Sequence, residues 1–235
     1  MDPRSLTIFL PAYNEEKGID GAISKILHSI ESIVDDYEIL VINDGSTDGT
    51  REKVLMWQKK NNRIRLIDHK GNLGYGATLR TGFKSAGKEL ILYTDADMPV
   101  DPNEIRNILP HTKEHDMVVG YRVDRKDKLC RFIYSAIYNS LLKVLFKIPV
   151  RDANFSFKCI HKKALSKCRL GARSVFIDGE LLAEAVRSDL KIKEIPIAYK
   201  PREYGKSNFD SLGAAFFTLR ELIGYRLRRF LRKRD

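Results

Sequence analysis

The sequence predicts an α/β fold with a mostly parallel central sheet, and three observations support this. Short runs rich in aliphatic and aromatic residues alternate with helical patterns through the first 120 residues. The predicted strands are almost continuously apolar, which is typical of parallel strands that helices cover on both faces. Turns rich in glycine and polar residues follow these strands, at the edge where open parallel sheets bind their ligands.

The predicted strands all lie in the first half of the chain. Between the first two, apolar residues from Ile19 to Ile30 recur at three- and four-residue spacing, which predicts a helix with one buried face. No internal repeat interrupts this alternation, so we expect a single domain. The five expected strands cover residues 6–10, 38–42, 64–67, 90–93 and 117–119.

Two basic, amphipathic helices are expected later in the chain, over residues 128–148 and 211–233. Residues 121–151 hold eight basic and two acidic side chains, and residues 211–235 hold seven and two, so these stretches account for the whole formal charge of +11. Such helices can lie flat on an anionic membrane. A helix that packs on the core and exposes a charged end explains the second stretch as well. Their apolar positions are Leu129, Ile133, Ile137, Leu141 and Leu145, and then Leu212, Ala215, Phe216, Leu219, Leu222 and Ile223.

Composition excludes several classes of protein. A chain of 235 residues with 43% hydrophobic and 31% charged residues is too apolar to be disordered and long enough for a large core. Cys130, Cys159 and Cys168 lack C-x-x-C spacing, so we expect neither a disulfide framework nor a zinc knuckle. We find no secretory signal and no run of ~20 apolar residues that could span a bilayer. An intracellular protein without a membrane span is expected.

Two carboxylates, Asp95 and Asp97, follow the fourth predicted strand. Crowded carboxylates are costly unless a cation neutralises them. Mg²⁺ and Mn²⁺ prefer oxygen ligands, and they usually bridge one or two carboxylates to substrate phosphates. Capping of a turn by aspartate is the competing explanation, and the two residues alone leave both open.

The turn after the second predicted strand reads DGSTDGT over residues 44–50. Its glycines let backbone approach a ligand, and Ser46 or Asp48 can cap the next helix. Asp44 suits a ribose hydroxyl or a base N–H, although an ordinary strand-to-helix turn fits nearly as well. The P-loop motif does not occur, and GNLGYG at 71–76 lacks the dinucleotide fingerprint. None of the five histidines has a motif-like setting, so we expect them to be structural or exposed.

In combination these motifs are far more specific. LPAYNEE, NDGSTDGT, GNLGYGATLRTGF and TDADMP together resemble the nucleotide-sugar-binding half of the family 2 glycosyltransferases with a GT-A fold, in order and spacing over residues 5–122. The segments from GYRVDRKDKLCRFIYSAIYN to RDANFSFKCIHKKAL, and from IDGELLAEAVRSD to KPREYGKSN, are similar to the acceptor half of dolichol-phosphate mannosyltransferases and related polyprenyl-phosphate hexosyltransferases. The resemblance ends near residue 209.

The resemblance implies a domain organisation and a set of site residues. A single catalytic domain is expected over residues 1–210, with a nucleotide-sugar half at 1–122 and an acceptor half at 123–210, followed by a basic amphipathic helix at 211–235. The implied nucleotide-sugar ligands are Pro11, Tyr13 and Glu15 around the base and ribose, Asp44 on the base, and Asp95 at the diphosphate. Arg122, Arg202 and Lys206 are implied on donor phosphate or lipid phosphate.

The resemblance also implies how metal and acceptor are held. Asp95 and Asp97 would hold Mg²⁺ or Mn²⁺ against the diphosphate, and with Arg122 they form the expected catalytic set. Arg131 and Ser135 match the positions that grip the acceptor phosphate. The residues agree independently, because an arginine fork matches phosphate oxygens and positions four apart share one helix face.

One departure concerns the metal site. Pro99 stands where the mannosyltransferase pattern has a glutamine ligand, so water, phosphate or another side chain such as Asp101 would complete the metal shell. Many dolichol-phosphate mannosyltransferases also carry transmembrane helices or rely on small membrane subunits. A small membrane subunit is therefore a candidate partner.

The expected function is transfer of a hexose, with inversion, from a nucleotide diphosphate sugar to dolichyl or polyprenyl monophosphate. GDP-mannose is the favoured donor, and UDP-glucose is the alternative that Pro99 encourages. Metal and basic side chains would stabilise the departing diphosphate. The acceptor is already an anion, so no general base is required, although Asp152 is the position to test as one.

The two basic helices and the resemblance also predict the location of the protein and its partners. The two basic helices would seat the enzyme peripherally on the cytoplasmic face of a membrane. Nucleic acid is not an expected partner, because the basic stretches are amphipathic and lack RNA- or DNA-recognition patterns. A non-catalytic membrane-surface protein on the same fold is the less favoured alternative, since the DAD, DG and GKS elements are intact.

Overall fold

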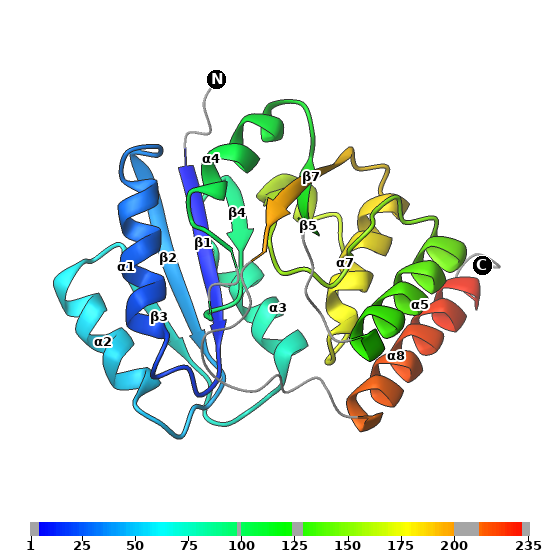
Figure 1. The fold of residues 1–235 in the computed structure, drawn as a ribbon, viewed down its shortest axis with the longest axis horizontal. Coiled ribbons are helices and arrows are strands. Elements are labelled where there is room, and N and C mark those ends of the chain that lie inside the picture. The colour runs from blue at the N-terminus through cyan, green and yellow to red at the C-terminus, as the bar shows by residue number, and fades with distance from the viewer. Residues whose placement is uncertain (1–4, 98–99, 124–128, 200–211, 232–235) are drawn as a thin grey trace.

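The computed structural model describes residues 5–97, 100–123, 129–199 and 212–231. Within them, one seven-stranded sheet has the order β3-β2-β1-β4-β6-β5-β7 (Figure 1). Only β6 runs antiparallel to its neighbours β4 and β5; the other paired strands of this sheet are parallel. The predicted α/β fold with a mostly parallel sheet is confirmed.

The strands and helices alternate along the chain as the sequence predicts. The strands are β1 (Ser5–Ala12), β2 (Asp36–Asn43), β3 (Ile64–Asp68), β4 (Leu90–Tyr93), β5 (Met117–Val123), β6 (Lys158–His161) and β7 (Ile192–Ala198). The α-helices are α1 (Ile19–Ile30), α2 (Thr50–Lys60), α3 (Tyr75–Ser85), α4 (Glu104–Ile108), α5 (Leu129–Phe146), α6 (Lys162–Leu165), α7 (Phe176–Arg187) and α8 (Leu212–Leu231), and a 3₁₀ helix covers Leu109–Lys113.

All five predicted strands are present, and β6 and β7 add two that the apolar runs do not reveal. β5 continues past the predicted end at residue 119 to Val123 because it pairs with β7 along its whole length. β6 has only four residues and begins at a lysine. Buried and exposed residues alternate along the second half of β7, as expected for a half-buried strand at the end of the sheet.

One row of residues, paired in register, crosses six strands of the sheet from β2 to β7. Beyond this row, β1, β2 and β4 end at the same edge of the sheet, so the residues that follow these strands meet at that edge. Asp95 lies two residues past the row after β4, and Arg122 lies three residues past it within β5. The row consists of Leu40, Phe9, Tyr93, Lys158, Val119 and Glu194.

Alternating side chains place two hydrophobic clusters on opposite faces of the sheet. In β1, Phe9 packs on the side of α3, α5, α7 and α8, whereas Ile8 and Leu10 pack on the side of α1, α2 and α4. The predicted helical pattern from Ile19 to Ile30 forms α1, with Ile19, Ile23, Ile26 and Ile30 fully buried. Helices on both faces explain the nearly continuous apolar strands.

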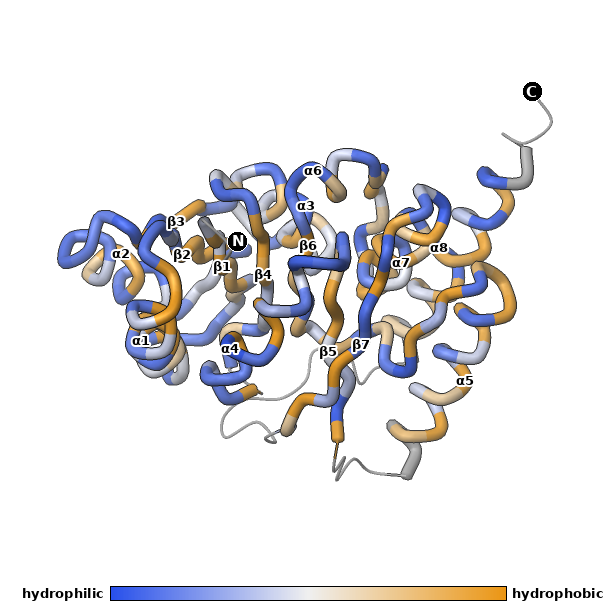
Figure 2. The backbone as a smooth tube through the Cα atoms, turned by 90° about the horizontal axis from the view of Figure 1, so that it is seen from above, coloured by the Kyte–Doolittle hydropathy of each residue, from blue (hydrophilic) through white to orange (hydrophobic). Residues whose placement is uncertain are grey.

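The two basic helices pack beside α7 at one end of the sheet (Figure 1). Rings of Phe146, Phe176 and Tyr225 join α5, α7 and α8, with centroids 5.5 to 6.5 Å apart. The inner face of α5 is therefore the one that carries Phe146, and the predicted apolar positions Ile133 and Ile137 are 49% and 57% exposed. Figure 2 shows apolar segments along both helices. No helix within the described ranges is long and apolar enough to cross a membrane.

Candidate active site

The loops after β1 and β2 are held together by side chain–backbone hydrogen bonds. Asn14 has a left-handed backbone conformation (φ 56°), which asparagine tolerates better than most residues. Its Oδ1 accepts from the N–H of Thr47 at 2.8 Å, and its own N–H donates to the Ser46 hydroxyl at 2.9 Å. Asp48 accepts from the N–H groups of Glu16 and Thr50, each at 3.0 Å. These hydrogen bonds join the two loops at the carboxyl edge of the sheet.

Asp44, the predicted base ligand, is 3% exposed and holds the loop that follows β3. Its Oδ1 accepts from the N–H of Leu73 at 2.9 Å and lies 2.8 Å from Nδ1 of His69, and its Oδ2 accepts from the N–H of Gly74 at 2.9 Å. A carboxylate offers about four acceptor positions, so these three contacts leave about one for a ligand. Asp44 therefore organises the loop, and its contact with a base stays a prediction.

The backbones of the loops after β2 and β3 lie so close together that a side chain at position 45 would not fit between them. Gly45 has φ 68°, and an ideal Cβ there would lie 2.5 Å from the carbonyl carbon of Gly71. Only glycine fits such a conformation and contact. The contact requires glycine at position 45 rather than at position 71, because an ideal Cβ on Gly71 would meet nothing within 4 Å; in the second motif it is Gly74 that has a positive φ, of 89°.

His69 is a site residue that the sequence analysis does not single out. Its Nδ1 faces Asp44, and its Nε2 lies 2.9 Å from the Thr81 hydroxyl. Both contacts are structural, as we expect for the histidines. One of them, however, holds Asp44, which is a predicted ligand of the base. Its position immediately after β3 is the signal that could have found it.

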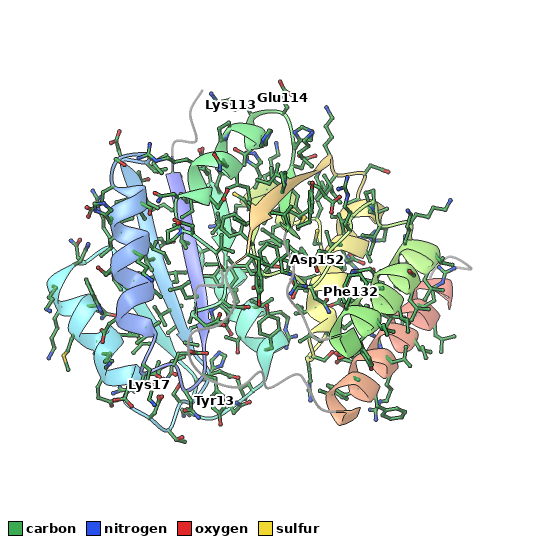
Figure 3. All side chains as sticks on the ribbon, viewed as in Figure 1. Tyr13, Lys17, Lys113, Glu114, Phe132 and Asp152 are labelled. Carbon is green, nitrogen blue, oxygen red and sulfur yellow. The ribbon has the colours of Figure 1, made fainter. Side chains whose placement is uncertain are left out.

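Pro11, Tyr13 and Glu15 lie at the end of β1 and in the following turn, and all three are half-buried. Tyr13 lies near the edge formed by the ends of β1 and β2 (Figure 3). An ideal Cβ on Gly18 would lie 3.9 Å from both Oε2 of Glu15 and the carbonyl oxygen of Ala96. The Glu15 carboxylate therefore lies close to the turn that carries the paired aspartates.

Asp95 and Asp97 occupy the turn after β4 and are half-buried. Burial, followed by the negative charge of Asp178 and also that of Asp95, raises the pKa values of the Tyr75 and Tyr93 phenols well above their ordinary value. Both phenols therefore stay protonated beside the carboxylates.

A buried ion pair lies beneath this turn. Lys158 and Asp178 have side chains 0% and 1% exposed, with Nζ and Oδ1 at 2.5 Å. Oδ1 also accepts from the Tyr93 hydroxyl at 2.5 Å, and the Lys158 ammonium donates to the carbonyl oxygen of Phe155 at 2.5 Å. Because the charged groups are satisfied, the pair can persist away from water. The sequence does not predict that Lys158 or Asp178 is buried, because a lysine beside apolar residues is usually an exposed charge.

Arg122 is paired with Asp152 rather than left open to solvent. Its Nε and one terminal nitrogen donate to the two Asp152 oxygens at 2.6 and 2.9 Å, and the two side chains are 9% and 5% exposed. The guanidinium also lies 5.5 Å from the Phe155 ring and 5.3 Å from the Tyr199 ring. A bidentate partner fixes the orientation of the arginine fork.

A second chain of contacts connects α5 to Asp152. The Asn139 side-chain amide donates to the Ser135 hydroxyl at 3.3 Å, and its Oδ1 accepts from the N–H of Ala153 at 3.0 Å. Figure 3 shows Asp152 and Phe132 on this side of the molecule. The predicted acceptor residue Ser135 is thus linked to the Arg122–Asp152 pair through Asn139, which the motifs do not reveal.

The backbone of Arg131 lies in the first turn of α5, while Arg202, Lys206 and Pro99 lie outside the described residues. Their roles stay predictions.

The donor set fits a hard divalent cation that a substrate helps to hold. Asp95 and Asp97 offer carboxylate oxygens from one turn, as Mg²⁺ and Mn²⁺ prefer. Across residues 5–97, 100–123, 129–199 and 212–231, no group of three or more His, Cys, Asp or Glu side chains is arranged to hold a metal. Two carboxylates with phosphate and water are a usual set for these ions, whereas structural zinc needs four protein ligands.

Comparison with known proteins gives a family and a fold. The chain matches the family described as glycosyl transferase family 2 over residues 7–169. Glucosyl-3-phosphoglycerate synthase from Mycobacterium tuberculosis, whose crystals contain Mn²⁺, UDP and glucosyl-3-phosphoglycerate, has a TM-score of 0.74 at 19% identity, covering 96% of this chain and 80% of that one. The match confirms the GT-A type of fold.

Two curated relatives are similar over most of this chain. A dolichyl-phosphate beta-glucosyltransferase, ALG5D of Trichomonas vaginalis, is 28% identical over 243 residues, covering 94% of this chain and 74% of the relative. An undecaprenyl-phosphate 4-deoxy-4-formamido-L-arabinose transferase of Photorhabdus laumondii is 26% identical over 212 residues, covering 88% and 63%. The chain thus spans less than two thirds of the length of the Photorhabdus laumondii transferase, and it spans only 33% of the length of another relative that it matches.

Proposed function

The chain belongs to glycosyl transferase family 2, and on this basis we propose that it transfers a hexose, with inversion, from a nucleotide diphosphate sugar to a polyprenyl or dolichyl monophosphate. The observation that carries the proposal is the common edge. There Asp95 and Asp97 follow β4, the Asp44 loop follows β2, and Arg122 extends beyond the same row of the sheet. Neighbouring strands are ~4.8 Å apart, so β4 and β5, which flank β6, lie ~10 Å apart, and the residues that extend beyond them meet at one edge.

The relatives favour glucose over mannose in this proposal. One is named for transfer of glucose to dolichyl phosphate, and the solved structure contains UDP. The preference for GDP-mannose therefore has no support among these relatives, and UDP-glucose becomes the first donor to test. GDP-mannose remains the second.

In the proposed mechanism, Asp95 and Asp97 would hold Mg²⁺ or Mn²⁺, and the ion would supply positive charge to the departing nucleotide diphosphate. Arg122, oriented by Asp152, would add positive charge where the leaving group develops negative charge. Asp44 and the loop it organises would contact the base. The acceptor phosphate is ionised at neutral pH, so the attacking oxygen needs no proton removed. The engagement of both Asp152 oxygens by Arg122 supports a mechanism without a general base.

The acceptor would enter beside α5, where Arg131 and Ser135 would contact its phosphate. Exposed apolar side chains on α5 and α8 would meet the membrane that contains the lipid. They are Phe132, Ile133, Tyr134, Ile137 and Val144 on α5 and Phe216, Phe217, Leu219, Ile223 and Leu227 on α8. An interfacial position on the cytoplasmic leaflet, with or without a small membrane subunit, is part of this proposal.

A donor and acceptor panel tests the proposal. Purified protein is incubated with Mn²⁺ and radiolabelled UDP-glucose, GDP-mannose or UDP-galacturonate, together with short-chain polyprenyl phosphate or the matching polyprenol. Label should pass into the organic phase from one donor and only with the phosphorylated lipid. Transfer to the polyprenol, or no transfer from any of the donors, would contradict the proposal.

A further inference from the structure

A basic groove of about 1320 Å³ lies between α7, α8 and the loop before α7. None of its lining residues is among those assigned above to donor, metal or acceptor. Its floor is formed by buried side chains, including Phe176 and Tyr225 at 1% and 7% exposure. Its cationic lining residues are Lys167, Arg169, Arg173, Arg187, Arg220, Arg228 and Arg229.

The acidic side chains of the groove do not neutralise most of this charge. Glu180 accepts from the N–H groups of Gly171 and Ala172, each at 2.8 Å, and Glu221 accepts from backbone and hydroxyl groups of the same loop. Glu184 is bound by Arg187 at 2.9 Å and by the Tyr225 hydroxyl at 2.6 Å. Of the seven lining cations, only Arg187 has a carboxylate partner within the part of the chain that the structure describes.

Arginine predominates among the cations that lack a carboxylate partner. Its planar fork pairs with two phosphate oxygens at once, which favours phosphate over a simple carboxylate. An exposed phosphomonoester carries close to two negative charges near neutral pH, because its second pKa is about 6. Several arginines that line one groove would suit such a dianion better than a singly charged phosphodiester.

The groove adjoins an exposed apolar stripe on the same helix. Arg220, Gly224 and Arg228 face the groove at four-residue spacing, while Leu219, Ile223 and Leu227 occupy the neighbouring face and are 42%, 49% and 59% exposed. At the boundary, the Arg220 guanidinium lies 5.9 Å from the Phe217 ring. A ligand with phosphate at one end and hydrocarbon at the other would match the two surfaces together.

We propose that this groove binds the head group of a phospholipid with a terminal phosphomonoester, at a site separate from the transfer site. The inference rests on the proposed membrane contact of α8, but not on the identity of the sugar or of the acceptor. The lipid chains would lie along the apolar stripe of α8 while the phosphate lies among Lys167, Arg169 and Arg220. A lipid bound in the groove would hold the enzyme with α5 and α8 against the bilayer.

The test compares vesicle binding of three full-length proteins by co-sedimentation. The groove variant carries Lys167→Gln, Arg169→Gln and Arg220→Gln, all at exposed positions. The control carries Lys25→Gln, Lys59→Gln and Lys84→Gln, which are exposed, remove the same charge and lie on α1, α2 and α3. Vesicles contain phosphatidylcholine with phosphatidic acid or with phosphatidylserine, matched for surface charge.

Wild type and control should bind phosphatidic acid vesicles at least tenfold more tightly than phosphatidylserine vesicles, and the groove variant should lose this preference. Equal binding by the groove variant and the control would overturn the proposal. So would competition by soluble glycerol phosphate at the lipid's own effective concentration, which would indicate a site for free phosphate. Sugar transfer to a short, water-soluble polyprenyl phosphate should be unchanged in both variants. Its absence in wild type would refute the proposed function while leaving the binding result intact.

Discussion

At the residue scale, the site depends on charged side chains that other side chains hold in place. Asp44 is fixed by His69 and two backbone N–H groups, and Arg122 is fixed by both oxygens of Asp152. Such contacts restrict each group to one orientation before substrate arrives. Preorganised charge is the largest contribution that a protein usually makes to a reaction with a charged leaving group.

The first prediction concerns the paired aspartates. Asp97→Asn should lower the transfer rate at least ~100-fold, because the amide would weaken metal binding at the diphosphate. The control is Asp35→Asn, an exposed carboxylate between α1 and β2. Thermal unfolding should be unchanged in both variants. Near-normal activity of Asp97→Asn, together with insensitivity of wild type to a chelator, would rule out the metal role.

The second prediction concerns the buried ion pair. Lys158→Met should lower the free energy of unfolding by roughly 3–5 kcal/mol, because it leaves Asp178 charged and buried without its cation. The double variant Lys158→Met, Asp178→Leu should recover part of that loss. Urea denaturation followed by circular dichroism measures both. A single variant as stable as wild type would contradict the stabilising role of this ion pair.

At the element scale, α5 packs on the core and carries the residues that we propose for the acceptor phosphate. Its inner face packs through Phe146 against α7 and α8, and its first two turns carry Arg131 and Ser135. Asn139 then connects Ser135 to the loop that holds Asp152. The helix is therefore positioned by the core at one end and by the site at the other.

The third prediction concerns the acceptor phosphate. Arg131→Ala should raise the KM for polyprenyl phosphate by about 10- to 150-fold, since a hydrogen bond to a charged group contributes roughly 1.5–3 kcal/mol. The KM for the nucleotide sugar should change little. Lys143→Ala, an exposed cation on the same helix, is the control. Equal effects on both substrates would exclude Arg131 from the acceptor site.

The fourth prediction concerns the exposed apolar side chains of α5 and α8, which we propose to meet the membrane. Ile137 and Ile223 are 57% and 49% exposed, and replacing both with serine should weaken vesicle binding by about 10- to 150-fold, because burying the exposed half of each contributes roughly half of the 1.5–3 kcal/mol of a fully buried side chain. Met56→Ser on α2, also 57% exposed, is the control. Flotation with vesicles measures binding. Unchanged flotation of the double variant would remove these helices from the interface.

At the scale of the whole molecule, the sequence predicts the framework better than the support of the site. Apolar runs and glycine-rich turns identify β1 to β5, because strand burial and tight turns depend on local composition. β6 escapes prediction because it pairs with β4 and β5, which lie 39 to 71 positions earlier in the sequence, and the Lys158–Asp178 pair escapes it because its members lie 20 positions apart. The same holds for the Asp44–His69 contact, which spans 25 positions. Motifs identify residues that a ligand would touch, whereas their supporting partners become visible only in the folded structure.

The most direct test of the central claim is the chemical identity of the product. Wild-type protein is supplied with Mn²⁺, the active nucleotide sugar and short-chain polyprenyl phosphate, and the lipid product is analysed by mass spectrometry and by proton NMR of the anomeric position. The account predicts a polyprenyl phosphate that carries one hexose, with the anomeric configuration inverted relative to the donor. A product with retained configuration, or release of the sugar into water without a lipid product, would contradict it.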